Sequence, residues 1–335
     1  MHESLMELDH AQLKIRFRIA ARLCGLALLS LFMCRISLAQ RSVPAPIHGV
    51  TADNKNDVRD GAFLAKLLAA LSHLSVKPTV RIVYTPGNER GFFSASSYLD
   101  ATRQIGGAGY VLGQPVDSFY MHCFTPAEHL ARFKDYVDTL GSTVDIWEVG
   151  NEINGEWLFG NTNKCKPRAS VSSTSQADVV TKMTQAYDYV KAQGKVAALT
   201  LYYNAPCHRP AANEMFAWTS ANIPERMKTG LDYVLVSYYE LDCQGHRADW
   251  LDVFSKLAAM FPSSKLGISE FGWSNSKPAK RVVKDLIQRT YAVHPDVPGW
   301  VGGGFYWEFA IDMVPYDPVP DSLWSTINTA MANQK

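Results

Sequence analysis

Two stretches of the sequence end in side chains that could perform acid–base or nucleophilic chemistry. Residues 144–152 (VDIWEVGNE) form an apolar run that finishes with Asn151 and Glu152, and residues 266–270 (LGISE) finish with Glu270. A carboxylic acid can donate a proton to a leaving group, and a carboxylate can attack an electrophilic carbon. Two glutamates therefore supply both halves of a displacement reaction, provided that the fold brings these distant residues into one site.

The elements around them alternate regularly from Pro44 onward. Apolar runs typical of buried strands begin at residues 47, 79, 109, 144, 196, 233, 265 and 303, and a segment with helical spacing follows each one. In the helix expected after the third strand, Pro126 suits the first turn and Gly141 the end. Strands that alternate with helices in this way predict parallel βαβ units, here closed into a single (β/α)8 TIM barrel over residues 40–335.

An open, doubly wound sheet is the alternative fold. It usually carries a Gly-rich turn after its first strand, and residues 47–57 (IHGVTADNKND) contain none. The glycines of residues 104–113 precede a strand, and those of residues 299–305 are expected before strand eight, where they would ease close packing. No linker or repeat divides the chain, so one barrel is the prediction.

Composition excludes some classes of protein. The 335 residues are 47% apolar with a formal net charge of +1, which disfavours both a nucleic-acid surface and a disordered chain. Residues 1–39 predict a cleaved signal peptide: a basic region, an apolar run over residues 23–34, and small residues that end at Ala39. A membrane anchor is the alternative, but Arg35 interrupts the run, and a spanning helix needs roughly 20 apolar residues. We expect a secreted or periplasmic protein without a membrane segment in its mature form.

Cleavage after Ala39 would leave four cysteines, Cys123, Cys165, Cys207 and Cys243. An even count in an exported protein predicts two disulfides, and the sequence does not choose among the three pairings. On a barrel the four would lie in the loops after strands three to six, so neighbouring loops would pair Cys123 with Cys165 and Cys207 with Cys243. Each bridge would stabilise a loop-built rim by about 3 to 4 kcal/mol. No Cys or His spacing typical of a metal site occurs, so no metal is expected.

A barrel places its active site at the carboxyl ends of its strands. Arg81 lies on the second strand, Glu152 follows the fourth, and Glu270 ends the seventh. Strands four and seven are nearly opposite in an eight-strand ring, so the two carboxylates would face each other with room for a sugar between them. Retaining glycoside hydrolases use such a pair roughly 5 to 5.5 Å apart.

The same stretches resemble a known group of enzymes. WEVGNE (147–152), ISEFGW (268–273) and GGFYWEF (303–309) are similar to strands four, seven and eight of clan A, the retaining glycoside hydrolases that share a (β/α)8 barrel. The resemblance extends over the mature chain in strand order. Ile153 stands where many members have a proline directly after the Asn-Glu pair, so the family within the clan is not assigned.

The resemblance implies a role for each residue of the pair and for its neighbours. Glu152 would be the general acid and then base, with a pKa raised toward neutrality, and Glu270 the nucleophile. Asn151 would bind the sugar 2-hydroxyl. Arg81 and Tyr239, with Tyr238 as second choice, would keep Glu270 ionised.

Three tryptophans are candidate sugar contacts. Trp307 would form a stacking platform beside the scissile bond, and Trp157 and Trp273 are looser candidates, for which packing in the wall is the favoured alternative. Other residues also have structural alternatives: Asn151 could cap a helix, Arg81 could only neutralise an acid inside the barrel, and Tyr239 could be a core residue.

We thus expect an exported, monomeric protein, and the resemblance to clan A implies a glycoside hydrolase that cleaves β-linked poly- or oligosaccharide through a covalent intermediate, with no cofactor. A non-catalytic glycan-binding barrel and a transglycosylase are the alternatives. The sugar, and endo or exo action, stay open.

Overall fold

The computed structural model describes residues 40–52, 56–84, 92–159, 165, 174–204, 207, 211–274 and 276–335. The predicted signal peptide, residues 1–39, lies outside the described residues, and residues 41–335 form one unit. No helix among the described residues is long and apolar enough to cross a membrane.

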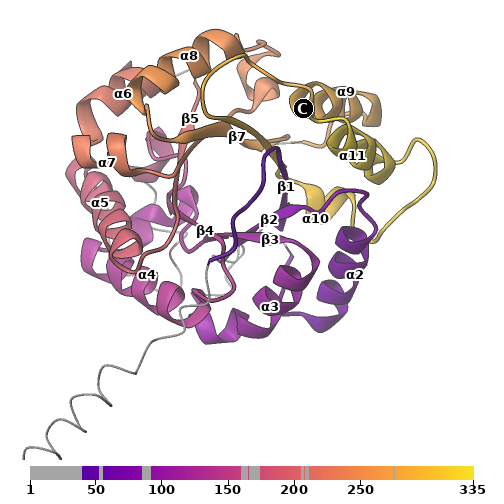
Figure 1. Ribbon diagram of the computed structural model, residues 1–335, viewed down its shortest axis with the longest axis horizontal. Coiled ribbons are helices and arrows are strands. Elements are labelled where there is room, and N and C mark those ends of the chain that lie inside the picture. The colour runs from indigo at the N-terminus through magenta and orange to yellow at the C-terminus, as the bar shows by residue number, and fades with distance from the viewer. Residues whose placement is uncertain are drawn as a thin grey trace, which may run out of the picture. The chain divides into compact units, whose positions relative to one another are not determined.

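Eight parallel strands close into a barrel in the order of the sequence, which confirms the predicted (β/α)8 TIM barrel. Each strand pairs with the next, and β8 pairs with β1. Figure 1 shows the helices as a ring around the strands. The strands are β1 Ile47–Ala52, β2 Thr79–Val83, β3 Tyr110–Gln114, β4 Ile146–Gly150, β5 Ala197–Tyr202, β6 Tyr233–Ser237, β7 Lys265–Phe271 and β8 Trp300–Tyr306.

The helices begin where the sequence offers caps. Thr125 and Glu128 form a capping box ahead of Pro126, and Ser175 and Asp178 form another, so each pair satisfies backbone N–H groups of the first turn. The α-helices are α2 Gly61–Ser72, α3 Leu99–Ala108, α4 Pro126–Leu140, α5 Gln176–Ala192, α6 Met215–Asn222, α7 Glu225–Gly230, α8 Trp250–Met260, α9 Lys280–Tyr291, α10 Phe309–Asp312 and α11 Leu323–Ala332. Short 3-10 helices occupy several loops: η1 Ala95–Tyr98, η2 Ser118–Cys123, η3 Glu156–Phe159, η5 Ala211–Asn213 and η6 Glu240–Cys243.

The prediction for strand eight was wrong at both ends. The expected strand covered residues 303–310, whereas β8 runs from Trp300 to Tyr306 and residues 309–312 form α10. The glycines therefore lie inside the strand. Gly303 has a φ of 103°, and a Cβ on it would collide with the backbone of Ile268 on β7. Glycine is needed there because it alone combines this φ with so close an approach of two strands.

The barrel interior changes from apolar to polar along its axis. One end holds an apolar layer made of Ile47, Leu112, Ile146, Ala198, Tyr233, Leu235, Val301 and Phe305. Further along the strands the buried side chains include Arg81, Glu148, Thr200 and Ser269. A larger apolar cluster fills the space between strands and helices. The apolar layer therefore supports a polar layer at the carboxyl ends of the strands.

Both disulfides join loops at that end. Cys123 pairs with Cys165 and Cys207 with Cys243, at Cα–Cα distances of 5.2 and 5.4 Å, as predicted from neighbouring loops. Within the described ranges, the atoms that could hold a metal gather at one place, His122 with Cys123 and Cys165, whose two sulfurs are bonded to each other.

Candidate active site

Glu270 accepts hydrogen bonds from three different strands or strand ends. It lies in β7, is 3% exposed, and contacts the Nη1 of Arg81 on β2. Asn151 Nδ2 donates to Glu270 at 2.8 Å, and the hydroxyl of Tyr239 donates at 2.9 Å. The guanidinium and the amide nitrogen can only donate, so these contacts suit a carboxylate rather than a carboxylic acid. Burial, and then the charge of Glu270, raises the pKa of Tyr239, so its hydroxyl keeps the proton it donates.

Arg81 is shared between two carboxylates. It is fully buried and contacts both oxygens of Glu148, from Nε at 2.9 Å and from Nη2 at 2.8 Å, while Nη1 faces Glu270. Thr200 also donates to Glu148. Burial alone would lower the pKa of Arg81, but the charges of Glu148 and Glu270 outweigh burial and raise it above its ordinary value. Arg81 therefore pairs with an acid inside the barrel, Glu148, and it also contacts Glu270. The two alternatives for Arg81 do not exclude each other.

Glu152 has a different set of partners. Its two carboxylate oxygens accept hydrogen bonds from the hydroxyls of Ser237 and of Ser118, the latter at 3.3 Å. The side chain is 7% exposed. Burial first, and then the negative charge of Glu270, raises its pKa well above the ordinary value, and the hydrogen bond from Ser237 opposes this shift. A carboxyl in this setting releases its proton less readily than a carboxyl in water.

A turn brings both Asn151 and Glu152 into the site. Consecutive side chains of a strand point to opposite faces, but β4 ends at Gly150, and Glu152 has a φ of 42° in the left-handed region. Such a conformation costs a non-glycine residue about 1 to 3 kcal/mol and is concentrated at functional sites. Here it allows two neighbouring polar residues to reach Glu270 and Ser237, respectively.

Ser118 connects three of the predicted residues. Its backbone N–H donates to Asn151 Oδ1 at 2.8 Å, so the amide group of Asn151 is oriented with its nitrogen toward Glu270. Its hydroxyl donates to Glu152 and accepts from Trp157 Nε1 at 3.0 Å. The side chain of Asn151 therefore joins η2 to β7, and these contacts differ from those of a helix cap.

The three predicted tryptophans have different surroundings. Trp307 is partly exposed, and its ring centroid lies 5.7 Å from the guanidinium carbon of Arg81. Trp157 is also partly exposed and packs edge-on against Tyr202. Trp273 donates from its Nε1 to Asp312 at 3.4 Å.

Tyr238 is not brought to the two carboxylates. Its hydroxyl donates to the carbonyl of His246 at 2.7 Å, and its ring packs edge-on against Tyr203 and Trp250 outside the barrel. The alternation of side chains explains the difference from Tyr239.

Four residues that contribute to the site were not predicted from the sequence: Glu148, Ser118, Ser237 and Asp117. Asp117 is 5% exposed and accepts from Phe119 N at 2.8 Å at the start of η2; burial, and then the charge of Glu270, raises its pKa to about 7. A signal existed for two of them. Glu148 lies two residues from the inward-facing Ile146, and Ser237 two residues before Tyr239, so side-chain alternation places each on the inner face.

No protein-family profile matches the sequence, and no curated protein is significantly similar to it. Solved structures do match. A GH5-4 broad-specificity endoglucanase from an uncultured bacterium superposes with a TM-score of 0.54 at 12% identity, over 87% of this chain and 96% of that one. A glucosidase from Croceicoccus marinus gives 0.52 at 11% identity, over 88% and 69%. A Saccharomyces cerevisiae Gas2p mutant in complex with laminaritetraose and laminaripentaose gives 0.50 at 15% identity, over 86% and 65%.

The chain is therefore structurally similar to clan A glycoside hydrolases, as the strand motifs suggested. At these identities the likeness establishes the barrel fold. The chain also covers only about two thirds of the length of the Croceicoccus marinus and Gas2p structures.

Proposed function

We propose that this protein is a retaining glycoside hydrolase in which Glu152 is the acid and base and Glu270 the nucleophile. One observation carries the proposal: two partners of Glu270 can only donate, whereas both serine partners of Glu152 can donate or accept. Glu270 is bound by Arg81 and by the amide nitrogen of Asn151, which only donate. Glu152 is bound by two serine hydroxyls, which can donate to a carboxylate or accept from a carboxylic acid. The first environment fits a group that stays ionised, and the second fits one that gains and loses a proton.

The reaction proceeds by two displacements. Glu270 attacks the anomeric carbon, the glycosidic C–O bond breaks, and the proton of Glu152 passes to the departing oxygen. The product is an ester between the sugar and Glu270. Glu152, now ionised, then removes a proton from water, and the resulting oxygen attacks the same carbon and releases Glu270. Two inversions at the anomeric carbon give net retention, and every proton and electron pair is supplied by the two glutamates and water.

The surrounding residues have supporting roles in this proposal. Asn151 would bind the sugar 2-hydroxyl through Nδ2, which contacts Glu270 before the ester forms. Tyr239 and Arg81 stabilise the ionised nucleophile before attack and after release. Trp307, close to Arg81, offers an aromatic face beside the reacting sugar, with Trp157 and Trp273 further out.

A β-linked glucan is the first substrate to test. The similar structures include an endoglucanase, a glucosidase and a protein with bound laminari-oligosaccharides, and two disulfides join loops at the catalytic end. Disulfides persist in oxidising compartments, which together with the predicted signal peptide supports an exported enzyme. We expect a monomer that needs no metal or organic cofactor.

Covalent labelling tests the proposal directly. Intact protein is incubated with activated 2-deoxy-2-fluoro β-glucoside and β-laminaribioside, and its mass is measured. We expect a gain of one fluorosugar that maps to Glu270 and is absent in Glu270→Gln. Glu156→Gln, at an exposed loop glutamate, is the matched control and should label normally. Hydrolysis of glucan that yields the inverted anomer, or a label on another residue, would refute the proposed roles. Binding of glucan without turnover would favour a non-catalytic barrel.

A further inference from the structure

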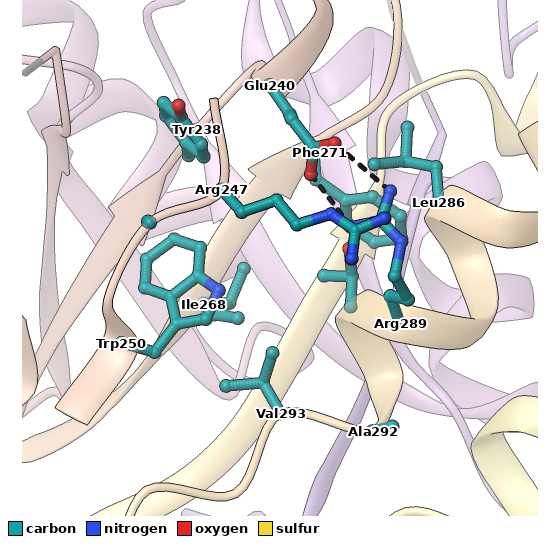
Figure 2. A pocket seen from close by; sticks show the side chains of 12 residues that line it. Tyr238, Glu240, Arg247, Trp250, Ile268, Phe271, Leu286, Arg289, Ala292 and Val293 are labelled. Carbon is teal, nitrogen blue, oxygen red and sulfur yellow. Dashed lines mark hydrogen bonds and ion pairs between the residues drawn. The ribbon is translucent and has the colours of Figure 1, made fainter. Parts of the chain in front are cut away.

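A cavity lies on the outer side of the barrel, behind the strand that carries Glu270. Its volume is about 300 Å³, at the small end of the range for ligand pockets. Ile268 and Phe271 of β7 form its floor, Trp250 at the start of α8 forms one wall, and Leu286 of α9 forms another (Figure 2). The cavity is thus separate from the mouth of the barrel, where the two carboxylates lie.

Glu240, Arg247 and Arg289 are the charged residues that line this cavity. Arg289 of α9 binds Glu240 through two nitrogens at 2.8 and 3.1 Å, and its Nε contacts Asp285 at 2.8 Å, so each of its three nitrogens already donates to a carboxylate. Arg247 is exposed, lines the same cavity and has no hydrogen bond or ion pair within the described parts of the chain. Figure 2 shows its side chain reaching across the cavity in the direction of the Glu240–Arg289 pair.

Aromatic and aliphatic side chains make up the rest of the lining. Trp250 packs one face on Phe254, and Tyr238 meets its edge. The Nε1 of Trp250 has no hydrogen-bond partner among the described residues. Ala248 and Val293 complete an apolar wall. The cavity therefore combines an apolar body of single-ring size with a cation and an indole donor that are both available.

These features select one class of ligand. The apolar lining would gain from burying an aromatic ring, at about 25 cal/mol per Å² of apolar surface removed from water. The planar guanidinium of Arg247 can bind a carboxylate with two parallel hydrogen bonds, a geometry that a hydroxyl cannot match. A sugar fits less well, because its hydroxyls would face six or more apolar side chains without partners.

The geometry points to a binding site for a small aromatic carboxylate, in which the ring lies on Trp250 and Phe271 and the carboxylate pairs with Arg247. The site is independent of the proposed glycosidase reaction. Its floor nevertheless adjoins that reaction's residues in sequence, since Phe271 follows Glu270 and Tyr238 precedes Tyr239.

Calorimetric titration of the whole protein with 3-phenylpropionate tests this site, with 3-phenylpropan-1-ol as the uncharged analogue. The acid should bind at least tenfold more tightly than the alcohol. Arg247→Gln should weaken binding of the acid about tenfold and leave the alcohol unchanged, because only the acid pairs with the guanidinium. The matched control is Arg281→Gln, which removes an exposed arginine of α9 that does not line the cavity and should change neither affinity.

The position of the ligand needs a second variant. Ala248→Phe should fill the cavity and abolish binding of both compounds, while its unfolding transition shows that the protein is folded. The inference is overturned if the acid does not bind, if acid and alcohol bind equally, or if Ala248→Phe or Arg247→Gln leaves binding of the acid intact.

Discussion

Replacing Ser237 by alanine should move the alkaline limb of the pH–rate profile to higher pH. The hydroxyl of Ser237 donates to Glu152, and this bond lowers the pKa of that carboxyl. Burial and the charge of Glu270 act in the opposite direction and persist in the variant. Without this donor, burial and the charges of Glu270 and Asp117 still raise the pKa of Glu152, and they are opposed only by Arg81 and by the longer hydrogen bond from Ser118. Glu152 should therefore hold its proton to higher pH.

The size of the shift follows from the hydrogen bond. A hydrogen bond to a charged group contributes about 1.5 to 3 kcal/mol, and 1.36 kcal/mol corresponds to one pKa unit. The alkaline limb should thus rise by about 1 to 2 pH units. The quantity to measure is kcat/KM against pH, since it reports the ionisations of the free enzyme, with a β-glucoside whose poor leaving group needs protonation.

Ser269→Ala is the matched control for this experiment. Ser269 is a buried serine of β7 that contacts Thr200 at 3.2 Å and has no hydrogen bond to Glu152. The alkaline limb of the Ser269→Ala variant should therefore stay at the wild-type pH. If the alkaline limb of folded Ser237→Ala stays at the wild-type pH or moves to lower pH, Glu152 is not the proton donor.

Three further changes test the charge network. Arg81→Met should destabilise the fold by about 3 to 5 kcal/mol in urea titrations, because Glu148 and Glu270 would be left buried without their cation; an unchanged midpoint would contradict this. Tyr239→Phe should lower kcat roughly 10- to 100-fold with the fold intact, since it removes one hydrogen bond to the nucleophile; equal kcat values would exclude that role. Asp117 binds a proton more tightly when folded, so wild-type stability should fall as pH rises from about 4 through about 7, by up to about 4 kcal/mol from this group. Asp117→Asn should lack that part of the decline, and parallel pH–stability curves would refute the assignment.

The fold could be predicted because its signals are local. Parallel strands buried on both faces appear as short apolar runs, and amphipathic helices with caps appear between them. Strand eight was expected to begin at residue 303, three residues too late, because Gly302 was placed before the strand; it lies inside β8, where β7 closely approaches the neighbouring Gly303. Nothing in the sequence reports that contact.

The site was predictable as far as strand ends could be located. Glu270 was predicted from its position near the end of β7, and Tyr239 from the resemblance of the sixth strand to clan A. Ser118 does not follow, because a residue in a loop after β3 meets Asn151 and Glu152 only in three dimensions. The left-handed turn at Glu152 is equally invisible in the sequence, since a non-glycine residue gives no local sign of a positive φ.

The charges of the site also indicate how one carboxyl could serve as acid and then base. The negative charge of Glu270 raises the pKa of Glu152, second only to burial. In the proposed mechanism Glu270 becomes an ester after the first step, and this charge disappears. The pKa of Glu152 must then fall, because Ser237 still donates to it while the electrostatic repulsion has gone. Glu152 would thus hold its proton when the leaving group needs one and lose it when water must be activated. Arg81 stays paired with Glu148 throughout, so the buried guanidinium is not left without a counter-charge while Glu270 is esterified.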